Sequence, residues 1–474
     1  MASPNSGTDF RLAHSIGGTM KQQHVTLVIP PYPYGKGQVF LNGSIVSIAA
    51  RLKAMNRTVS VIDLNIDRLE DVRILSILRQ AHLIGVSLTG SPHIPGCIEL
   101  AKKLQQINPS AVLMLGGQVI ENLTRDQFRS IFGQTIKQIQ HVSDLAKVLG
   151  CNVNEVPSPE TVSYRPVLEN MEEERLTLYL RHEMPLVVSQ GCVHGCHFCA
   201  ASKKRKESFR SLLCFEDDLL FMAQTAKKRG LTVIKFYASS LDFFQNPGVV
   251  REYLQALARV REQTGVDIRV RCLSRLDSFI KATKADPETG KLLARAGLWN
   301  IGFGVDGTDA SILKAQGKGQ YTTEDAATCI RLCLFCGVKP ELLMVFGFPQ
   351  DNLWTLLKTV LISFAAVLRW GVVIRPYMAK DIVPGNRGWL IEEGRVKLVV
   401  SEPLKFYNLD FAALATKITH PRVLHRWLCN IAYLTLCAVL WPFGKCSTAP
   451  VLPQSGKVLG PIAKRINRLM PFDR

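Results

Sequence analysis

Three cysteines at short spacing in the middle of the chain are the residues with the clearest chemistry. Cys192, Cys196 and Cys199 stand in the order Cys-x3-Cys-x2-Cys within the segment QGCVHGCHFCA. Thiolates at this spacing can hold three irons of one [4Fe–4S] cluster and leave the fourth iron without a protein ligand. An open metal position is where a substrate or cofactor binds. The spacing therefore predicts an iron–sulfur cluster with one reactive corner.

The residues around these cysteines predict a loop. Gly191 and Gly195 flank and interrupt the set, so the backbone can turn tightly enough to gather three sulfurs around one cluster. The apolar run 184–188 directly before the loop predicts a strand that supports it. Phe198 stands next to the last cysteine, where its ring would shield one side of the cluster from water.

A second cysteine set has the same spacing, Cys-x3-Cys-x2-Cys, but different surroundings. Cys329, Cys333 and Cys336 follow TTEDAAT, which is typical of a helix start, and precede Gly337, which is typical of a helix end. On a helix the outer two would lie about 10 Å apart along the axis, so they could not wrap around one cluster. We therefore predict that this second set is part of the hydrophobic core.

The loop around Cys192 resembles the cluster loop of the radical S-adenosylmethionine (SAM) superfamily, whose motif is Cys-x3-Cys-x-aromatic-Cys. The resemblance implies that the open iron chelates the amino and carboxylate groups of SAM. It also implies reductive cleavage of SAM to methionine and a 5′-deoxyadenosyl radical, which removes hydrogen from an unactivated carbon. In such enzymes the cofactors carry the hard chemistry, and the protein orients them and excludes water.

Strand and helix patterns alternate along most of the chain and predict an α/β protein. We expect a disordered N-terminus at 1–22, a doubly wound parallel sheet at 23–150 and a linker with one short helix at 151–184. Six strand–helix units then predict a partial (β/α)6 barrel of the TIM type at 185–389, with its chemistry at the carboxyl ends of the strands. The remaining segment, 390–474, is predicted to be mainly helical.

The strand ends of the N-terminal sheet resemble the cobalamin-binding domain that precedes the barrel in one branch of the superfamily. Ser87, in Ser87-Leu88-Thr89, and the pair Gly116-Gly117 occupy the positions that line the nucleotide tail of cobalamin in that domain. Small residues would let a bulky tail approach the backbone closely.

The first turn of this sheet departs from the pattern of many cobalamin domains. Their Asp-x-His-x-x-Gly motif, whose histidine ligates cobalt from below, is replaced here by PPYPYGKG. Tyr32 and Tyr34 are the candidates for the lower face. A degenerate domain that no longer binds cobalamin stays open as the alternative.

Polar residues at the ends of the predicted barrel strands are candidates for the SAM pocket. The resemblance places three of them after the second strand, two after the third, a carboxylate after the fourth where relatives usually carry glutamate, and a bend after the fifth. For each polar residue, an ordinary contact at the barrel rim is the alternative. The candidates are Ser239, Ser240, Asp242, Ser274, Arg275, Asp306 and Gly347.

An apolar segment near the C-terminus, 427–443, has a composition that could suit a membrane. It falls short of the ~20 residues that a spanning helix needs, and Asn430 and Pro442 interrupt it. We therefore predict a buried or interfacial helix. It would either cap the substrate cavity or make a peripheral contact with a membrane.

Composition narrows the compartment and the partners. Thirteen cysteines, an odd number scattered along 474 residues, favour a reducing cytosol, and 1–22 lacks the apolar stretch of a signal peptide. We expect a cytoplasmic protein, with or without membrane association. The net charge of +19 would attract anionic surfaces. No zinc-finger pattern or basic–aromatic repeat is present in the sequence, so a nucleic-acid partner is not expected.

The resemblance leads to one functional expectation and two alternatives. We expect a cobalamin-dependent radical SAM methyltransferase that receives electrons from a reductant such as flavodoxin or ferredoxin and methylates an unactivated carbon of a small molecule or lipid. A radical SAM enzyme that forms rings, oxidises or rearranges without methyl transfer is one alternative. A non-catalytic iron–sulfur protein for electron transfer or binding is the other. The sequence leaves the substrate open among natural products, lipids and tetrapyrrole-like molecules.

Overall fold

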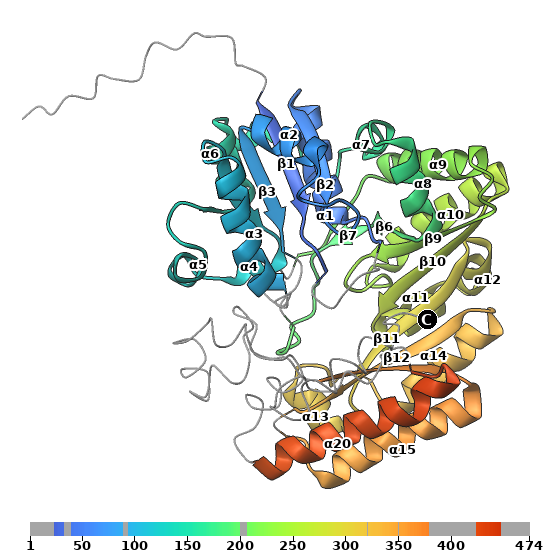
Figure 1. Cartoon of the computed structure of the whole chain (residues 1–474). Helices are drawn as coiled ribbons and strands as arrows, with labels where there is room; N and C mark the ends of the chain where they lie inside the picture. The colour runs from blue at the N-terminus through green and yellow to red at the C-terminus, as the bar shows by residue number, and fades with distance from the viewer. Residues whose placement is uncertain are drawn as a thin grey trace, which may run out of the picture.

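The computed structural model describes residues 23–32, 39–88, 93–199, 206–319, 321–348, 350–378 and 423–446. Two parallel sheets with helices packed against them form most of this part of the chain (Figure 1). The N-terminal sheet has the strand order β2-β1-β3-β4-β5, and the second has the order β13-β12-β11-β10-β9-β6. Both are parallel throughout. The predicted fold class, a doubly wound sheet followed by a partial barrel, is confirmed.

The N-terminal sheet follows the predicted alternation over most of its length. Two helices, α4 and α5, separate β4 from the last strand, β5, which has only two residues and is followed by α6. The elements are β1 (His24–Ile29), α1 (Gly43–Ala54), β2 (Thr58–Asp63), α2 (Val72–Gln80), β3 (Leu83–Ser87), α3 (Ile94–Ile107), β4 (Val112–Gly116), α4 (Gln118–Asn122), α5 (Arg125–Phe132), β5 (Lys137–Gln138) and α6 (Val142–Leu149).

The linker contains more helix than the sequence predicted. It forms a 3-10 turn, η2 (Val153–Glu155), and two short α-helices, α7 (Arg165–Glu169) and α8 (Glu173–Arg181), instead of one. Buried polar contacts hold them in place: Asp218 on the neighbouring helix α9 accepts hydrogen bonds from the backbone N–H groups of Tyr164 and Arg165, at 2.9 Å each, and pairs with Arg210. The prolines of the segment therefore shape its turns without preventing short helices.

The barrel strands also lie where the sequence placed them. Helices α11 and α13 are additions that were not predicted. The elements are β6 (Glu183–Val187), β7 (Ser189–Gln190), β8 (Ser208–Phe209), α9 (Leu212–Lys228), β9 (Val233–Ser239), α10 (Pro247–Thr264), β10 (Asp267–Ser274), α11 (Leu276–Ala285), α12 (Glu288–Arg295), β11 (Leu298–Asp306), α13 (Ala310–Ala315), α14 (Thr323–Phe335), β12 (Lys339–Phe346), α15 (Leu353–Trp370) and β13 (Val373–Met378).

The second cysteine set lies on α14, as predicted. The helix begins with a capping box in which Thr322 and Asp325 satisfy each other's backbone N–H groups. Cys329 and Cys333 have no exposed surface, and Cys336 is half-buried directly after the helix. The prediction that these cysteines belong to the core is therefore confirmed for the first two.

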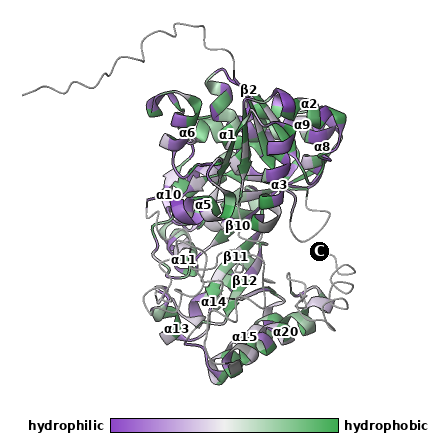
Figure 2. Cartoon of the chain, turned by 60° about the vertical axis from the view of Figure 1, so that its left-hand side comes forward, coloured by the Kyte–Doolittle hydropathy of each residue, from purple (hydrophilic) through white to green (hydrophobic). Residues whose placement is uncertain are grey.

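The two sheets share one hydrophobic core. A continuous cluster of buried side chains runs from β1 and α1 through α7 and α8 into the barrel, and Figure 2 shows these strands as predominantly hydrophobic. Helix α1 packs so closely on β6 that a Cβ at Gly43 would lie 3.2 Å from Pro185. Tyr179 on α8 adds a buried hydrogen bond of 2.6 Å to Asp63 at the end of β2. The two sheets are thus packed into one body.

The described part of the C-terminal region is a helix that covers the last barrel strands. Helix α20 (Val423–Leu440) packs against α15, β12 and β13 and is followed by the 3-10 turn η4 (Trp441–Phe443). Cys446 and Ile374 then form an isolated parallel β-bridge. Within the described residues, α15 alone is long and apolar enough to cross a membrane by length and composition. The predictions for 1–22, Tyr34, Thr89 and the rest of 390–474 lie outside the described residues.

Candidate active site

The first cysteine set lies on a loop that leaves the carboxyl end of β6. Strands β7 and β8 pair antiparallel and close the base of this loop. Gly191 has φ +85°, and a Cβ there would collide with the carbonyl oxygen of Lys206. Glycine is therefore required where the chain enters the loop. This geometry agrees with the prediction of a tight loop around Cys192.

Backbone and ring contacts fix the loop over the carboxyl ends of the other barrel strands. The N–H of His197 donates to the carbonyl oxygen of Gln316 at 3.1 Å, and the N–H of Val193 donates to Oε1 of Gln245 at 3.0 Å. Phe198 packs against Phe348, which follows β12, with ring centroids 5.6 Å apart. The cysteines therefore lie at the end of the barrel where the sequence placed the chemistry.

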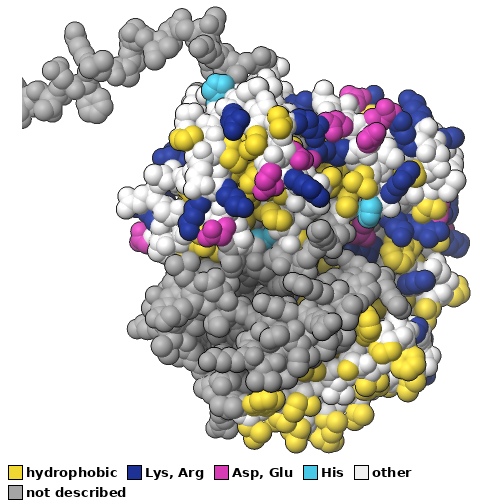
Figure 3. Space-filling model, viewed as in Figure 1, with side chains coloured by type: hydrophobic (Ala, Val, Ile, Leu, Met, Phe, Trp, Pro, Cys, Tyr) yellow, Lys and Arg dark blue, Asp and Glu magenta, His cyan; other side chains and the backbone are white. Residues whose placement is uncertain are grey.

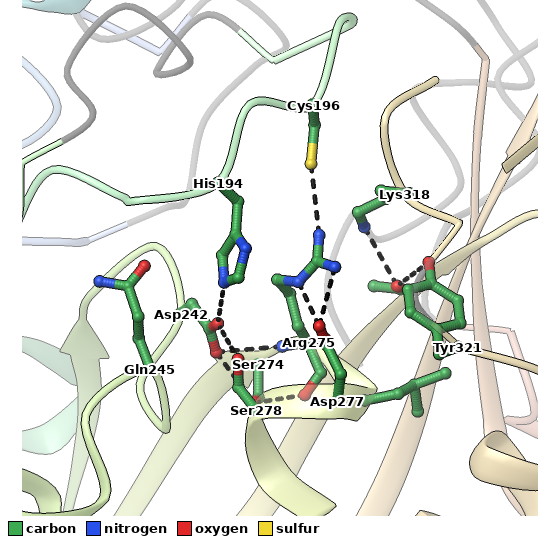
Figure 4. Close-up of polar contacts among 12 residues, drawn as sticks. His194, Cys196, Asp242, Gln245, Ser274, Arg275, Asp277, Ser278, Lys318 and Tyr321 are labelled. Carbon is green, nitrogen blue, oxygen red and sulfur yellow. Dashed lines mark hydrogen bonds and ion pairs between the residues drawn. The ribbon is translucent and has the colours of Figure 1, made fainter. Parts of the chain in front are cut away.

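Two cations lie near the buried sulfur of Cys196 (Figure 4). Nη1 of Arg275 is 3.4 Å from this sulfur, and the same guanidinium holds Asp277 through two hydrogen bonds of 2.9 and 3.0 Å. Burial raises the pKa of the Cys196 thiol, while the charges of Lys318 and Arg275 lower it. The surroundings of Cys196 are thus set up to offset a negative charge on sulfur.

Lys318 forms a buried ion pair with Asp306 at the end of β11. Its Nζ also donates to the carbonyl oxygen of Gly304 at 3.2 Å and lies 5.6 Å from the ring centroid of Phe198. Burial lowers the pKa of Lys318 to about 8. Asp306 has φ +58°, an uncommon backbone conformation for a residue other than glycine. The position predicted to contact SAM is therefore occupied by a carboxylate that already has a cationic partner.

Asp242, at the end of β9, is the centre of a second polar network. It accepts hydrogen bonds from Ser274 Oγ at 3.1 Å, Ser278 Oγ at 2.6 Å and the backbone N–H of Arg275 at 3.1 Å. Nε2 of His194, on the cysteine loop, lies 3.3 Å from Oδ2 of Asp242, the oxygen that also accepts from Ser278, and Figure 4 shows the imidazole pointing down to the carboxylate. This network connects the ends of β9 and β10 and helix α11 to the loop.

Of the other predicted SAM residues, two make structural contacts within the protein and one is partly exposed. Ser240 Oγ is 2.8 Å from Ser189 Oγ, so it connects two strand ends and is buried. Gly347 has φ +96°, and its N–H donates to Asp351 at 2.9 Å, which makes it a turn residue. Ser239 is half-buried and remains a candidate for a ligand contact.

Sequence reasoning missed four residues of this site. Lys318, Tyr321 and Asp277 come from the segments that follow the strands, and His194 comes from the loop itself. A lysine between two glycines, Gly317-Lys318-Gly319, is a signal that could have been noticed. Tyr321 gave no such signal, because its hydroxyl reaches the carbonyl oxygens of Gly304 and Val305 only in the folded chain.

The cobalamin candidates lie together at the carboxyl ends of β3 and β4. Oγ of Ser87 is buried without a hydrogen-bond partner among the described residues, so it remains available to a ligand. Gly117 has φ +100°, and a Cβ there would collide with the backbone of Leu88, whereas a Cβ at Gly116 would meet ordinary contacts of 3.5 Å. The close packing of the strand ends thus explains Gly117 without any ligand.

The residues fit a [4Fe–4S] cluster by the chemistry of their donors. Cys192, Cys196 and Cys199 supply three thiols, and the two cations offset thiolate charge. Within the described residues, no three His, Cys, Asp or Glu side chains are gathered closely enough for a single metal ion. A cluster spaces its ligands farther apart than a single ion does, so this finding does not conflict with it.

Comparisons with known proteins agree with this geometry. Residues 186–361 match the model of the radical SAM superfamily. The fold resembles that of the radical SAM methyltransferase TsrM from Kitasatospora setae, solved with cobalamin and a [4Fe–4S] cluster bound, at a TM-score of 0.61 and 16% identity over 79% of this chain and 78% of that one. The cobalamin-dependent radical SAM enzyme OxsB matches at a TM-score of 0.58 and 17% identity over 81% of this chain and 56% of that one.

A match among characterised sequences is shorter. Bacteriochlorophyllide d C-12(1)-methyltransferase from Chlorobaculum tepidum is 22% identical over 171 residues, which is 36% of this chain and 34% of that protein. The chain thus spans about a third of that relative's length. Residues 186–361 are therefore similar to the radical SAM superfamily, and most of the chain shares its fold, a parallel sheet followed by a barrel, with TsrM and OxsB.

Proposed function

We propose that this protein is a cobalamin-dependent radical SAM methyltransferase, which cleaves SAM reductively and methylates an unactivated carbon of a small molecule or lipid. The observation that carries the proposal is the position of the cysteine loop over the strand ends, with Arg275 on the sulfur of Cys196. The folds of TsrM and OxsB support the cobalamin part. The short match to a bacteriochlorophyllide methyltransferase supports methyl transfer and leaves the substrate open.

The residues of the loop would hold the cluster and protect it from water. When bound, the cluster, SAM and cobalamin would supply the electron, the radical and the methyl group, respectively. The three loop cysteines would ligate iron. Phe198, packed on Phe348, would exclude water from one side. A cytosolic reductant such as flavodoxin or ferredoxin would deliver the electron.

The polar residues at the strand ends would act in two ways. Asp242 and Ser274 would position the loop through His194 and Arg275, since they already hydrogen-bond within their network. The proposed contacts to SAM are Ser239, which is half-buried, and the Lys318–Asp306 pair, whose lysine interacts with Cys196 and Cys199. Ser87 and Gly116 would line the tail of cobalamin.

The test is anaerobic incubation of reconstituted protein with labelled SAM and a reductant. We expect 5′-deoxyadenosine from the wild-type chain and from Cys333→Ala, and none from Cys196→Ala. Absence of 5′-deoxyadenosine from wild-type protein with a full cluster would remove the radical assignment. Retention of cobalamin during purification tests the methyl-transfer part separately, and Ser87→Trp should reduce it without changing the iron content.

A further inference from the structure

Helix α15 buries several hydroxyl side chains and exposes large apolar ones. A surface helix usually turns its apolar side chains to the core and its polar ones to water. In α15 the buried face carries Thr355, Thr359 and Ser363 beside Leu356 and Ala366. The side chains on the outer face are large and apolar, and each is at least 44% exposed: Leu353, Trp354, Leu357, Leu361 and Leu368.

The buried hydroxyl groups of α15 are satisfied within the protein. Thr359 Oγ1 lies 2.9 Å from Thr308 Oγ1, and Ser363 Oγ donates to the carbonyl oxygen of Thr359 at 2.8 Å. Thr355 Oγ1 donates to the carbonyl oxygen of Asn352 at 3.0 Å. These hydrogen bonds stabilise the orientation in which the hydroxyl groups face the protein. The leucines on the opposite side of the helix are therefore exposed in the folded chain.

Helix α20 packs beside α15 and extends the same surface. Its inner face is buried at Cys429, Leu436 and Leu440. Its outer side chains, with Phe443 of the following turn, are at least 45% exposed: Leu424, Trp427, Ile431, Val439 and Phe443. We call the ten exposed side chains of α15, α20 and this turn the apolar face. Figure 3 shows a broad band of hydrophobic side chains at the lower edge of the molecule, where Figure 1 places these two helices.

The two helices that carry the apolar face have basic but no acidic side chains. Residues 353–378 and 423–446 contain no Asp or Glu. Arg369 is exposed and stacks over Trp370 at 4.9 Å, and Lys358 is half-buried on the same helix. An apolar surface with exposed tryptophans, Lys358 and Arg369 matches an anionic membrane interface.

We propose that the apolar face docks onto the surface of an anionic lipid bilayer, with α15 and α20 lying in the plane of the interface. Helix α15 connects β12 to β13, which are neighbours in one parallel sheet. Both ends of the helix therefore return to the sheet, and it cannot span a bilayer despite its length and hydropathy. Trp354 and Trp427 are exposed by 72% and 63%, as expected for aromatic side chains at a membrane interface.

A bilayer fits this face better than a second copy of the chain. Apposing two such faces would bring Arg369, Lys358 and their copies together without any acidic residue on either helix to pair with them. Lipid phosphates would supply that opposite charge. The proposal does not depend on the reaction and stands or falls separately from the proposed function.

Co-flotation of the full-length protein with vesicles tests the proposal. We expect wild-type protein to float with vesicles of phosphatidylcholine and phosphatidylglycerol, less with phosphatidylcholine alone, and less at high salt. The double variant Trp354→Glu/Leu361→Glu should lose about tenfold or more of the bound fraction, because each carboxylate would have to enter the apolar region. Leu213→Glu is the matched control, since Leu213 is 81% exposed on α9, outside the apolar face, and should bind as wild type.

Two further measurements keep the result interpretable. Circular dichroism would show whether each variant folds, and Leu361→Ser replaces the double variant if it does not. Quenching of tryptophan fluorescence by brominated lipids tests wild-type protein without any substitution. Wild-type protein that stays unbound at every lipid composition would overturn the proposal. So would a wild-type dimer without vesicle binding that Trp354→Glu converts to a monomer, because the face would then be a contact between copies.

Discussion

Two cysteine sets with similar spacing occupy different environments in this molecule. Cys192, Cys196 and Cys199 lie on a glycine-bounded loop, whereas Cys329 and Cys333 lie on one face of α14 with no exposed surface. Arg275 lies 3.4 Å from the sulfur of Cys196. Cys329 instead donates to the carbonyl oxygen of Leu276 at 3.6 Å, and burial raises its pKa well above the usual range. Backbone shape and nearby charge, more than spacing, separate a ligand from a core residue.

Replacing one cysteine in each set should give the largest difference between the two sets, in the amount of iron bound. Cys196→Ala should lower the iron bound after anaerobic reconstitution by about tenfold or more, because two protein thiolates cannot hold the cluster firmly. Cys333→Ala should keep its iron and lower the free energy of unfolding by about 1 kcal/mol, the cost of a small buried group. Iron analysis and urea unfolding measure these effects. Equal loss of iron in both variants would contradict the comparison.

The glycine beside each set provides the next largest contrast. Gly191→Ala combines φ +85° with a collision against Lys206, so we expect a several-fold loss of bound iron. Gly337→Ala, with φ +71° and open space around it, should cost only about 1 kcal/mol of stability and no iron. Iron content and thermal unfolding of both variants would check this. An unchanged iron content in Gly191→Ala would show that the loop tolerates a different entry.

Removing the cation beside Cys196 should change the cluster without removing it. Arg275→Met should make the midpoint potential more negative by ~50–100 mV, from a Coulomb energy on the order of 1–2 kcal/mol for one charge. A redox titration followed by electron paramagnetic resonance measures it. Arg271→Met is the control, because Arg271 lies on β10, which ends directly before Arg275, and pairs with Glu183 at 2.6 Å. A similar shift in both variants would assign the effect to general destabilisation.

A last prediction concerns pH and the turn behind Phe198. Burial raises the pKa of Asp351 to about 6, above its usual value of 3.8. The folded chain therefore binds more protons than the unfolded chain between these values, so this group's contribution to stability falls as pH rises from about 4 to 6. The difference in unfolding free energy between Asp351→Asn and wild type should change by about 2–3 kcal/mol over that window. A difference that is constant with pH would rule out this titration.

The sequence predicted regular elements better than the contacts between them. Apolar runs such as 112–116 set the strands, because burial on both faces requires continuous hydrophobic side chains. Helix α5 was missed although Thr124 and Gln127 form a capping box, a pattern visible in the sequence. Short polar helices give only a weak periodic signal, since few of their residues are buried.

The candidate site shows the same limit. Ser274 and Asp306 were placed correctly at strand ends, because strand ends follow from the alternation of elements. Their partners were not foreseen: Lys318 reaches Asp306 from a loop twelve positions further along the chain. Asp242 was expected to face SAM, yet it is satisfied by Ser274 and Ser278. Such pairings depend on three-dimensional packing that single-sequence patterns do not encode.

The hydrophobic core common to both sheets limits how this protein could be dissected. Cutting the chain near residue 150 would separate α1 from Pro185 and Val187 and leave Tyr179 without its hydrogen bond to Asp63. Neither fragment would be a self-sufficient folding unit, so expressing them apart should give insoluble material. Chimeras with related proteins would have to exchange both sheets together. The shared core would then keep the distance between the two sets of strand ends unchanged.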